Sequence, residues 1–572
     1  MSRQARNAQH TGRNSLVLAL LMSGLLLLAG RAMYLQVFNS EFLQEQGNAR
    51  HTRLVKDNSH RGMILDRNGS PLAVSTPVSS VSAQPAALLE AYRQWPRLAA
   101  LLGMSPRELR QLVNRNEGRE FMYLRRHVTP DLAARVMALN IDGVALLREY
   151  RRYYPLGSVA GHVVGFTNVD DQGQEGMELA YNTWLSAIPG AKRVLRDLQG
   201  NSVEVAESVR LPKPGKNLSL SIDRRIQYLA YRELKAAVLE HRAQSGSAVV
   251  LDAHTGEVLA MVNEPDFNPN NRADMRSQTF RNRAVTDLFE PGSTLKPFTI
   301  AVALDSGKFL PSTIIDTTPG LIRVGDRTIR DVHNYGVLTV ASVIEKSSNV
   351  GASKIALTLN KQSMWEELHS LGFGQSTGST LPGEVTGLLN PSSSWVPVEQ
   401  ASISFGYGIS VTPLQLARAY GAIANDGKIV PLTMLHPETP VVETRVMTSA
   451  TARRLQSMLE LAVSDDGTGK AARVADYRVA GKTGTVRKLT PSGYSEDQYV
   501  AWFAGFAPAS NPRLVMVVAI DDPRHGGYYG GEAAAPVFSR VITEALRLLD
   551  IAPDAPRREK KILTVKNERV EP

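Results

Sequence analysis

The stretch Glu290-Pro291-Gly292-Ser293-Thr294-Leu295-Lys296-Pro297 decides how the rest of the chain is interpreted. A Pro-Gly turn delivers Ser293 to the start of an apolar run, residues 298–304, which predicts a helix. Residues three apart lie on one helix face, so Ser293 and Lys296 are expected to be neighbours. A partly desolvated lysine can take the proton of a serine hydroxyl, which makes this pair a candidate nucleophile and base. The alternative is a helix capped by Ser293 with Lys296 in solvent, because Ser-x-x-Lys alone is common.

Two further motifs follow in order. Ser347-Ser348-Asn349 comes 54 residues after Ser293, and Lys482-Thr483-Gly484-Thr485 precedes a final run of predicted strands. Alone, the second motif predicts a capped helix and the third a hairpin turn. Ser-x-x-Lys, Ser-x-Asn and Lys-Thr-Gly in this order, however, form the pattern of penicillin-binding proteins and serine β-lactamases. Together the three motifs therefore predict serine acyl transfer.

The first two motifs supply the residue types that this chemistry needs. Ser293 is the expected nucleophile, and Lys296 is its base. The like charge of Lys482 is expected to help keep Lys296 neutral. Ser347 is expected to pass a proton to the leaving group, and Asn349 to hold Lys296 and the substrate amide.

The third motif is expected to bind the substrate. The hydroxyls of Thr483 and Thr485, with Lys482, suit the carboxylate of a peptide C-terminus. Gly484 has no side chain, so a substrate can lie along the strand and pair with its edge. The backbone N–H groups of Ser293 and Thr485 are the expected oxyanion hole, in which each donor contributes about 3 kcal/mol to the transition state.

The bulk composition limits the function less than the motifs do. The chain has 572 residues, enough for roughly three or four domain-sized units or one large domain with accessories. Its net charge of +10 comes without a run of lysine or arginine, so we expect no nucleic-acid partner. It has no cysteine, which excludes disulfides, thiolate catalysis and cysteine-ligated metals. We expect no metal and no cofactor.

The N-terminus predicts a membrane anchor. Arg3, Arg6 and Arg13 precede an uncharged stretch, residues 14–30, and the chain stays largely apolar to residue 38. No clean cleavage site follows, which favours an anchor over a removed signal peptide. We expect a cytoplasmic tail at 1–14 and a single transmembrane helix at 15–38, with everything after it outside.

The remaining pattern predicts an α+β protein. Residues 85–139 read as helical, and Pro212, Pro214 and Gly215 mark a linker before 217. From there the order is a strand, a helix, two strands, mostly helix-like segments from 298 to 420, two more strands and a closing helix. That order predicts an antiparallel sheet with helices packed on it. We expect a non-catalytic pedestal (dimerisation-type) domain at 39–216, a transpeptidase domain at 217–550 and a disordered tail at 551–572.

The chain resembles the class B penicillin-binding proteins, membrane-anchored D,D-transpeptidases that cross-link peptidoglycan. The resemblance covers roughly residues 15 to 550, and it is greatest to the septal, division-type members of Gram-negative bacteria or a close paralogue of them. Beyond the three motifs it rests on four stretches: Arg61-Gly62-x-Ile64-x-Asp66-Arg67-Asn68-Gly69, Arg152-x-Tyr154-Pro155-x-Gly157, Gly176-x-Glu178 and residues 405–415. The third motif has Thr483 where some septal enzymes have serine, and either hydroxyl can bond a carboxylate.

This resemblance implies a β-lactamase-like catalytic fold and a serine acyl-enzyme formed with peptidoglycan stem peptides at the division septum. It implies β-lactam antibiotics as inhibitors that acylate Ser293, and a septal glycan polymerase and other division proteins as partners. It also implies an inner-membrane location with the catalytic domain in the periplasm. Tyr499, Tyr528 and Tyr529 are expected to form an aromatic wall near the site, which Arg487 lines. Their alternative interpretations are a core tyrosine and a glycine-rich loop.

Three other functions fit the sequence less well. A class A β-lactamase needs Glu-x-x-x-Asn, and no such spacing lies between Asn349 and Lys482. A penicillin sensor needs more membrane spans or a cytoplasmic signalling part than this chain predicts. A scaffold with an idle enzyme is disfavoured by the intact motifs, although residues 39–216 could carry a scaffold role beside the catalytic one.

Overall fold

Two compact units make up the chain in the computed structural model, and each is discontinuous in sequence. The described residues are 3–40, 52–196, 202–271, 276–437, 439, 441–491 and 493–555. The smaller unit comprises Met1–His60, Pro77–Arg151 and Ala187–Pro214, and the larger comprises Arg61–Thr76, Arg152–Ser186 and Gly215–Pro572. Two segments expected in the pedestal, Arg61–Thr76 and Arg152–Ser186, thus cluster with the C-terminal part. The boundary at 216 stays a prediction, and most of the expected tail, 556–572, lies outside the described residues.

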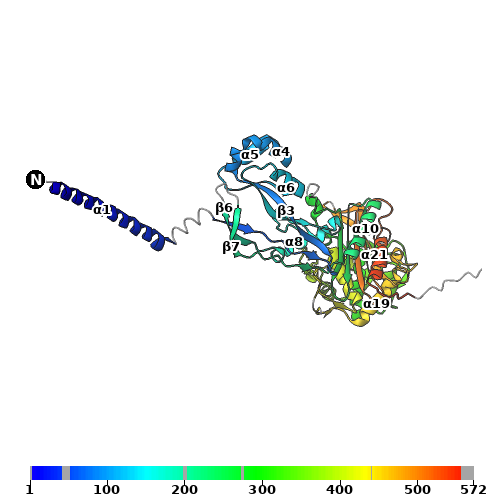
Figure 1. Cartoon of the computed structure of the whole chain (residues 1–572). Coiled ribbons are helices and arrows are strands. Elements are labelled where there is room, and N and C mark those ends of the chain that lie inside the picture. The colour runs from blue at the N-terminus through cyan, green and yellow to red at the C-terminus, as the bar shows by residue number, and fades with distance from the viewer. Residues whose placement is uncertain are drawn as a thin grey trace, which may run out of the picture. The chain divides into compact units, whose positions relative to one another are not determined.

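The N-terminal segment forms a long helix, α1 (Arg3–Met33), which continues into a π-helical turn, η1 (Tyr34–Phe38) (Figure 1). Among the described residues, Gly12–Phe38 is the one helical stretch long and apolar enough to cross a membrane. Its 27 residues span about 40 Å, more than the hydrocarbon core of a bilayer. The structure thus has the single N-terminal helix that the expected anchor requires, and the membrane anchor itself stays a prediction.

The smaller unit combines helices with two sheets. Helices α3 (Pro85–Glu90), α4 (Trp95–Leu102), α5 (Pro106–Arg115) and α6 (Pro130–Met137) contribute to one core, which contains Leu88, Leu98, Leu102 and Leu109. Strand β4 (Met122–Val128) pairs with β3 (Pro71–Ala83), which also pairs with β5 (Val144–Tyr153). A second sheet has the order β1 (Thr52–Asp57), β6 (Gly190–Arg196) and β7 (Ser202–Arg210).

The expected helical run 85–139 was wrong for β4. Met122, Leu124 and Val128 are buried in that strand, while Arg125 is exposed. A run this short carries too few residues to separate a period of two from a period of 3.6, and pairing with β3 decided its conformation.

The larger unit is built on a five-stranded antiparallel sheet, as predicted. The strand order is β10 (Val258–Glu264), β9 (Ser245–Asp252), β19 (Leu514–Asp521), β18 (Gly493–Ala507) and β17 (Ala480–Thr490). Strand β17 therefore lies at the edge of the sheet, where its outer backbone groups have no neighbouring strand within it.

Alternate residues of the buried strands face different cores. Ala248 and Val250 join the core under α10 (Arg224–Glu240) and α21 (Ala535–Leu548), which pack together (Figure 1). Val249 and Leu251 join the other core, which contains α13 (Lys296–Asp305) and α18 (Pro413–Ala424). A strand buried on both faces favours apolar residues at successive positions, which explains the apolar run 248–251 in β9.

The helical region after α13 contains strands that were not expected. Two short hairpin-like pairs interrupt it: β11 (Ile314–Asp316) with β14 (Val337–Thr339), and β12 (Leu321–Val324) with β13 (Arg327–Arg330). Helices α14 (Val340–Glu345) and α15 (Asn349–Leu357) follow them. The second motif lies between these two helices, directly after the unexpected strands.

Three stretches of the predicted family signature converge inside the larger unit. Arg61 Nε and Arg152 Nε each lie 2.6 Å from a different carboxylate oxygen of Glu178. Arg61 also donates to the side chain of Asn182 (2.8 Å) and to the backbone carbonyl of Glu178 (2.8 Å). All three charged side chains are at most 1% exposed, so this is a fully buried ion cluster in which two guanidinium groups share one carboxylate.

Candidate active site

The serine turn is held by close backbone packing. Ser293 lies in a 3₁₀ turn, η5 (Gly292–Leu295), which leads directly into α13. Gly292 has φ +54°, and a Cβ there would lie 2.4 Å from a methyl group of Val486. A Cβ on Gly406 would lie 2.1 Å from the Gly292 carbonyl oxygen. No other residue type fits these two positions without movement, so the Pro-Gly turn fixes the serine against both β17 and the 405–411 segment.

The Lys296 amine is the centre of the predicted constellation. Its Nζ lies 3.0 Å from Ser293 Oγ, 3.1 Å from Ser347 Oγ and 2.8 Å from Asn349 Oδ1. It also contacts the backbone carbonyl of Ser347. The lysine side chain is fully buried. The structure therefore brings the first two motifs together around one amine.

The environment of Lys296 favours its neutral form. Burial lowers the pKa of Lys296 well below its usual value, and the positive charge of Lys482 lowers it further, while Asp331 opposes the shift. In the described part of the chain, neither lysine forms an ion pair with a carboxylate. A neutral amine has a lone pair for the Ser293 proton, which is the property required of a base.

Asp331 supports the second motif, and no sequence pattern pointed to it. Its Oδ1 accepts from the backbone N–H groups of Asn349 (2.5 Å) and Val350 (3.0 Å), and its Oδ2 accepts from Ser348 Oγ (2.6 Å). Ser348 Oγ in turn caps α15 by accepting from Gly351 N (2.8 Å). Asp331 follows the unexpected strand β13, so its approach to the motif depends on tertiary structure that local patterns do not reveal.

Ser347 has a backbone conformation that few residues adopt. Its φ is +62°, in the left-handed region, where a residue with a Cβ is strained by the order of 1 kcal/mol or more. This conformation directs both its carbonyl and its hydroxyl at Lys296. The hydrogen bonds of the neighbouring helix start hold it there.

The third motif lies on the edge strand β17 and faces the serine turn. A Cβ added to Gly484 would lie 2.9 Å from the Pro291 carbonyl oxygen and 3.0 Å from Thr294 Cγ2. The absence of a side chain at Gly484 thus lets the strand pack against the turn, a reason that the sequence interpretation did not contain. The edge position expected for substrate pairing is present.

The threonines of this motif point to the opposite face of β17 from Gly484, since side chains alternate along a strand. Thr485 Oγ1 accepts from Gly530 N (3.0 Å). Thr483 Oγ1 lies 2.7 Å from Thr468 Oγ1, a residue to which no role was assigned.

Lys482 is a second fully buried lysine. Its Nζ lies 3.2 Å from the Thr483 carbonyl oxygen and 3.5 Å from the hydroxyls of Thr468 and Thr483. Burial lowers the pKa of Lys482 from 10.5 to about 7. Its charge near neutral pH therefore responds readily to an incoming anion.

The expected tyrosines form one stack. The ring centroids of Tyr499 and Tyr528 are 4.3 Å apart, and those of Tyr528 and Tyr529 are 4.5 Å apart. Tyr529 precedes Gly530, whose N–H reaches Thr485, so the stack adjoins the third motif. Arg487 is exposed, and it pairs in register with Tyr499 across β17 and β18.

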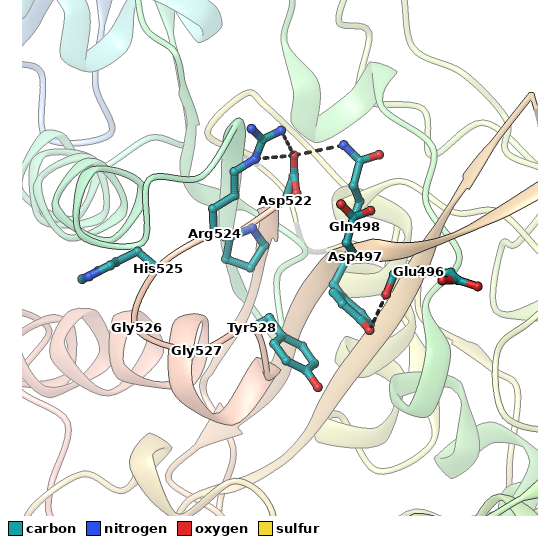
Figure 2. Close-up of a pocket in the computed structure, with 11 residues that line it drawn as sticks. Glu496, Asp497, Gln498, Asp522, Arg524, His525, Gly526, Gly527 and Tyr528 are labelled. Carbon is teal, nitrogen blue, oxygen red and sulfur yellow. Dashed lines mark hydrogen bonds and ion pairs between the residues drawn. The ribbon is translucent and has the colours of Figure 1, made fainter.

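A hollow of about 570 Å³ lies beside this stack. Glu496–Tyr499 and Asp522–Tyr528 line it. Figure 2 shows Arg524 and Gln498 converging on Asp522, with Tyr528 across the hollow. Because Arg524 pairs with Asp522, the two carboxylates of Glu496 and Asp497 give the hollow its negative charge.

Glu290, inside the opening stretch, ties the serine turn to two other segments. Its Oε1 accepts from Gly408 N (2.7 Å) and from the Tyr494 hydroxyl (2.8 Å). Burial raises the pKa of Glu290, against the lowering by these two hydrogen bonds. Gly408 belongs to the 405–415 stretch noted in the sequence, which the structure thus places against the turn.

Two family descriptions match the chain. Residues 246–543 match the penicillin binding protein transpeptidase domain, and residues 56–220 match the penicillin-binding protein dimerisation domain. Among curated relatives, the probable peptidoglycan D,D-transpeptidase PbpC of Pseudomonas aeruginosa is 42% identical over 97% of each chain. The peptidoglycan D,D-transpeptidase FtsI of Escherichia coli K12 is 41% identical over 95% of this chain and 93% of its own length.

Solved structures agree with these matches. Penicillin binding protein 3 of Mycobacterium tuberculosis, in complex with aztreonam, is 29% identical, with a TM-score of 0.68 over 88% of this chain and 99% of its own. The apo transpeptidase domain of Burkholderia pseudomallei penicillin-binding protein 3 is 44% identical, with a TM-score of 0.55 over 59% of this chain and 98% of its own.

Proposed function

The chain belongs to the class B penicillin-binding proteins, and from this premise we propose that it is a peptidoglycan D,D-transpeptidase acting through an acyl-enzyme on Ser293. One observation carries the proposal. A buried amine of lowered pKa, Lys296 Nζ, lies within hydrogen-bond distance of the hydroxyls of Ser293 and Ser347. This is the arrangement in which a serine can be deprotonated at neutral pH.

The first half-reaction forms the acyl-enzyme. Lys296 takes the proton of Ser293, and Oγ attacks the carbonyl carbon between the two terminal D-alanines of a stem peptide. The amide C–N bond breaks, Ser347 delivers its proton to the leaving nitrogen and is reprotonated by Lys296, which becomes neutral again, and D-alanine departs. The backbone N–H groups of Ser293 and Thr485 stabilise the oxyanion.

The second half-reaction transfers the acyl group. An amine of a second stem peptide attacks the ester carbonyl, the bond to Ser293 Oγ breaks, and a new amide forms. The amine proton passes through Lys296 back to the serine oxygen. Asn349 holds Lys296 in place through the 2.8 Å contact in both halves.

The substrate lies along β17 in this proposal. Its backbone pairs with the open strand edge, and its C-terminal carboxylate meets Lys482, Thr483 and Thr485. The stack of Tyr499, Tyr528 and Tyr529, with Arg487, lines the neighbouring surface. β-Lactams, which such a site also accepts, acylate Ser293 and remain there.

We place this activity at the division septum of a Gram-negative cell. The N-terminal anchor lies in the inner membrane, residues 1–14 face the cytoplasm and the catalytic domain faces the periplasm, in keeping with Arg3, Arg6 and Arg13 before the anchor. The partners are a septal glycan polymerase and other division proteins. The similarity to FtsI over almost the whole chain supports this placement.

Labelling with a fluorescent penicillin tests the chemistry. The full-length chain in detergent should be labelled, and Ser293→Ala should not, because the ester cannot form. Ser306→Ala, which removes a hydroxyl bonded to the Ala303 carbonyl near the end of α13, is a matched control that should label normally. Equal labelling of Ser293→Ala removes Ser293 as the nucleophile.

Depletion in the native host tests the placement. Loss of a septal transpeptidase should give filaments, because cells elongate without closing the septum. Rounded cells point to a role in elongation instead, and an unchanged shape points to a conditional paralogue; either result contradicts the septal assignment while leaving the chemistry intact.

A further inference from the structure

We propose that Thr468 is a third hydroxyl of the carboxylate subsite and helps to select donor peptides with a free C-terminal carboxylate. The inference rests on the proposed transpeptidase function and adds a specificity residue that lies outside the three motifs. Thr468 belongs to a loop, Asp466-Gly467-Thr468-Gly469, that precedes β17 in sequence.

The hydroxyl of Thr468 completes a cluster of three polar groups. Its Oγ1 lies 2.7 Å from Thr483 Oγ1 and 3.5 Å from Lys482 Nζ. Lys482 is fully buried and Thr483 is 7% exposed, whereas Thr468 is exposed. Thr468 therefore forms the solvent-facing side of the cluster, where a ligand arrives.

The hydrogen-bond count leaves a donor free for such a ligand. Each hydroxyl has one donor and two acceptor positions, so the contact between Thr468 and Thr483 uses one of their two protons. The other proton remains available, next to the amine of Lys482. This free hydroxyl proton and the amine of Lys482 are two convergent donors, and the lysine has no ion pair in the described residues. They suit a carboxylate, which accepts a bond from each and supplies the missing negative charge.

The backbone of the loop is held in place from three directions. Gly469 N donates to the Ala462 carbonyl (2.8 Å), and a Cβ on Gly531 would lie 2.5 Å from the Thr468 carbonyl oxygen. Lys346 Nζ, one residue before Ser347, donates to the Asp466 carbonyl (3.1 Å). The loop thus joins the second motif to the third, and Thr468 is positioned before a ligand binds, which lowers the cost of ordering it.

A pair of substrates separates carboxylate recognition from a purely structural role. The pair consists of an acyl-D-alanyl thioester whose leaving group ends in a carboxylate and the matching carboxamide, both turned over by the full-length chain in detergent. Thr468→Val keeps the shape of the side chain and removes the hydroxyl. We expect its kcat/KM on the carboxylate substrate to fall roughly tenfold or more relative to the carboxamide, as for a lost hydrogen bond to a charged group.

The controls show whether the lost hydroxyl or a change in side-chain packing causes the effect. Thr468→Ser keeps the hydroxyl and should restore the preference for the carboxylate. Thr543→Val removes a comparable hydroxyl on α21, bonded to the Ser539 carbonyl, and should leave the preference at the wild-type value. Thr468→Ala repeats the comparison if valine lowers the melting temperature.

Three results overturn the proposal: equal losses on both substrates, no loss on either, or a Thr468→Ser variant as impaired as Thr468→Val. Failure of the underlying function gives a different result. In that case Ser293→Ala turns over the thioesters as fast as the wild type, whatever residue stands at 468.

Discussion

The larger unit buries two clusters of basic side chains, and they differ in whether a carboxylate pairs with them. Around Glu178, two guanidinium groups share the two oxygens of one carboxylate at 2.6 Å each, with no exposed charge. Around Ser293, Lys296 and Lys482 are equally buried, but no carboxylate pairs with either in the described structure. In the first cluster the buried guanidinium groups face a carboxylate. In the second cluster burial favours the neutral amines, which can therefore exchange protons readily near neutral pH.

The largest effect is expected when the lysine cluster around Ser293 loses its base. Lys296→Met replaces the amine by an apolar side chain of similar length. We expect the acylation rate with a fluorescent penicillin to fall about 10²- to 10⁴-fold, because the general base is lost. The free energy of unfolding should not fall, because a buried amine without a carboxylate partner costs stability.

Lys354→Met, at a partly exposed position of α15, is the control and should acylate normally. A near-normal rate for Lys296→Met would remove the lysine as base, and a large loss of stability would contradict the account of its burial.

The second largest effect is expected when the Arg61–Glu178–Arg152 cluster loses its carboxylate. Glu178→Gln leaves the charges of Arg61 and Arg152 buried without a counter-charge. We expect a loss of about 3–5 kcal/mol in the free energy of unfolding, measured by urea titration in detergent. The acylation rate of the protein that remains folded should be unchanged.

An exposed pair serves as the reference. Glu544→Gln removes the partner of Arg547 on the surface of α21, where a loss of at most about 1 kcal/mol is expected. Similar losses for the two variants would show that the buried cluster contributes no more than a surface pair.

A smaller effect is expected from Asp331, which holds the second motif in place beside Lys296. Asp331→Asn removes the charge that receives hydrogen bonds from Ser348, Asn349 and Val350. We expect acylation to slow about tenfold, the equivalent of one weakened charged hydrogen bond. Asp316→Asn, at the exposed end of β11, should acylate at the wild-type rate. A normal rate for Asp331→Asn means that α15 holds its first turn without this carboxylate.

The last prediction is a change of stability with pH. The pKa of Lys482 is about 7 in the folded chain, against 10.5 for a lysine in water, so between these values the unfolded chain binds more protons. The free energy of unfolding therefore rises with pH across this window, by up to about 1.4 kcal/mol per pH unit. Below pH 7 the lysine is charged in both states, and its destabilising effect no longer changes with pH. Urea titrations from pH 7 to 9 should show this slope in the wild type relative to Lys482→Met. Parallel curves contradict the lowered pKa.

The same comparison shows what a sequence can reveal. Ser293, Lys296, Ser347, Asn349 and Lys482 were singled out as candidates from three short motifs, because each chemical role demands a particular residue type at a fixed local spacing. Helix α10 and strands β9, β18 and β19 were also predicted, since their apolar runs and flanking turns are local signals. The strands between 314 and 339 were not, because each is only three or four residues long.

The residues that contact the motifs from elsewhere in the chain could be identified only from the tertiary structure. Asp331, Glu290 and Thr468 carry no motif, and each reaches the site through contacts between segments distant in sequence. Gly484 was identified, yet the observed reason for a glycine there, the close approach of β17 to Pro291, is a tertiary contact.

The sequence by itself determined the chemistry: a serine, its lysine, the order of the motifs and an anchor helix ahead of them. Tertiary structure alone decided which buried basic side chains have a carboxylate partner. Arg61, Arg152 and Glu178 are ordinary charged residues until the chain brings them to one point, and Lys296 and Lys482 are ordinary lysines until burial removes their water. Desolvation and ion pairing depend on what surrounds a group in three dimensions, and the neighbouring residues in the sequence do not determine either one.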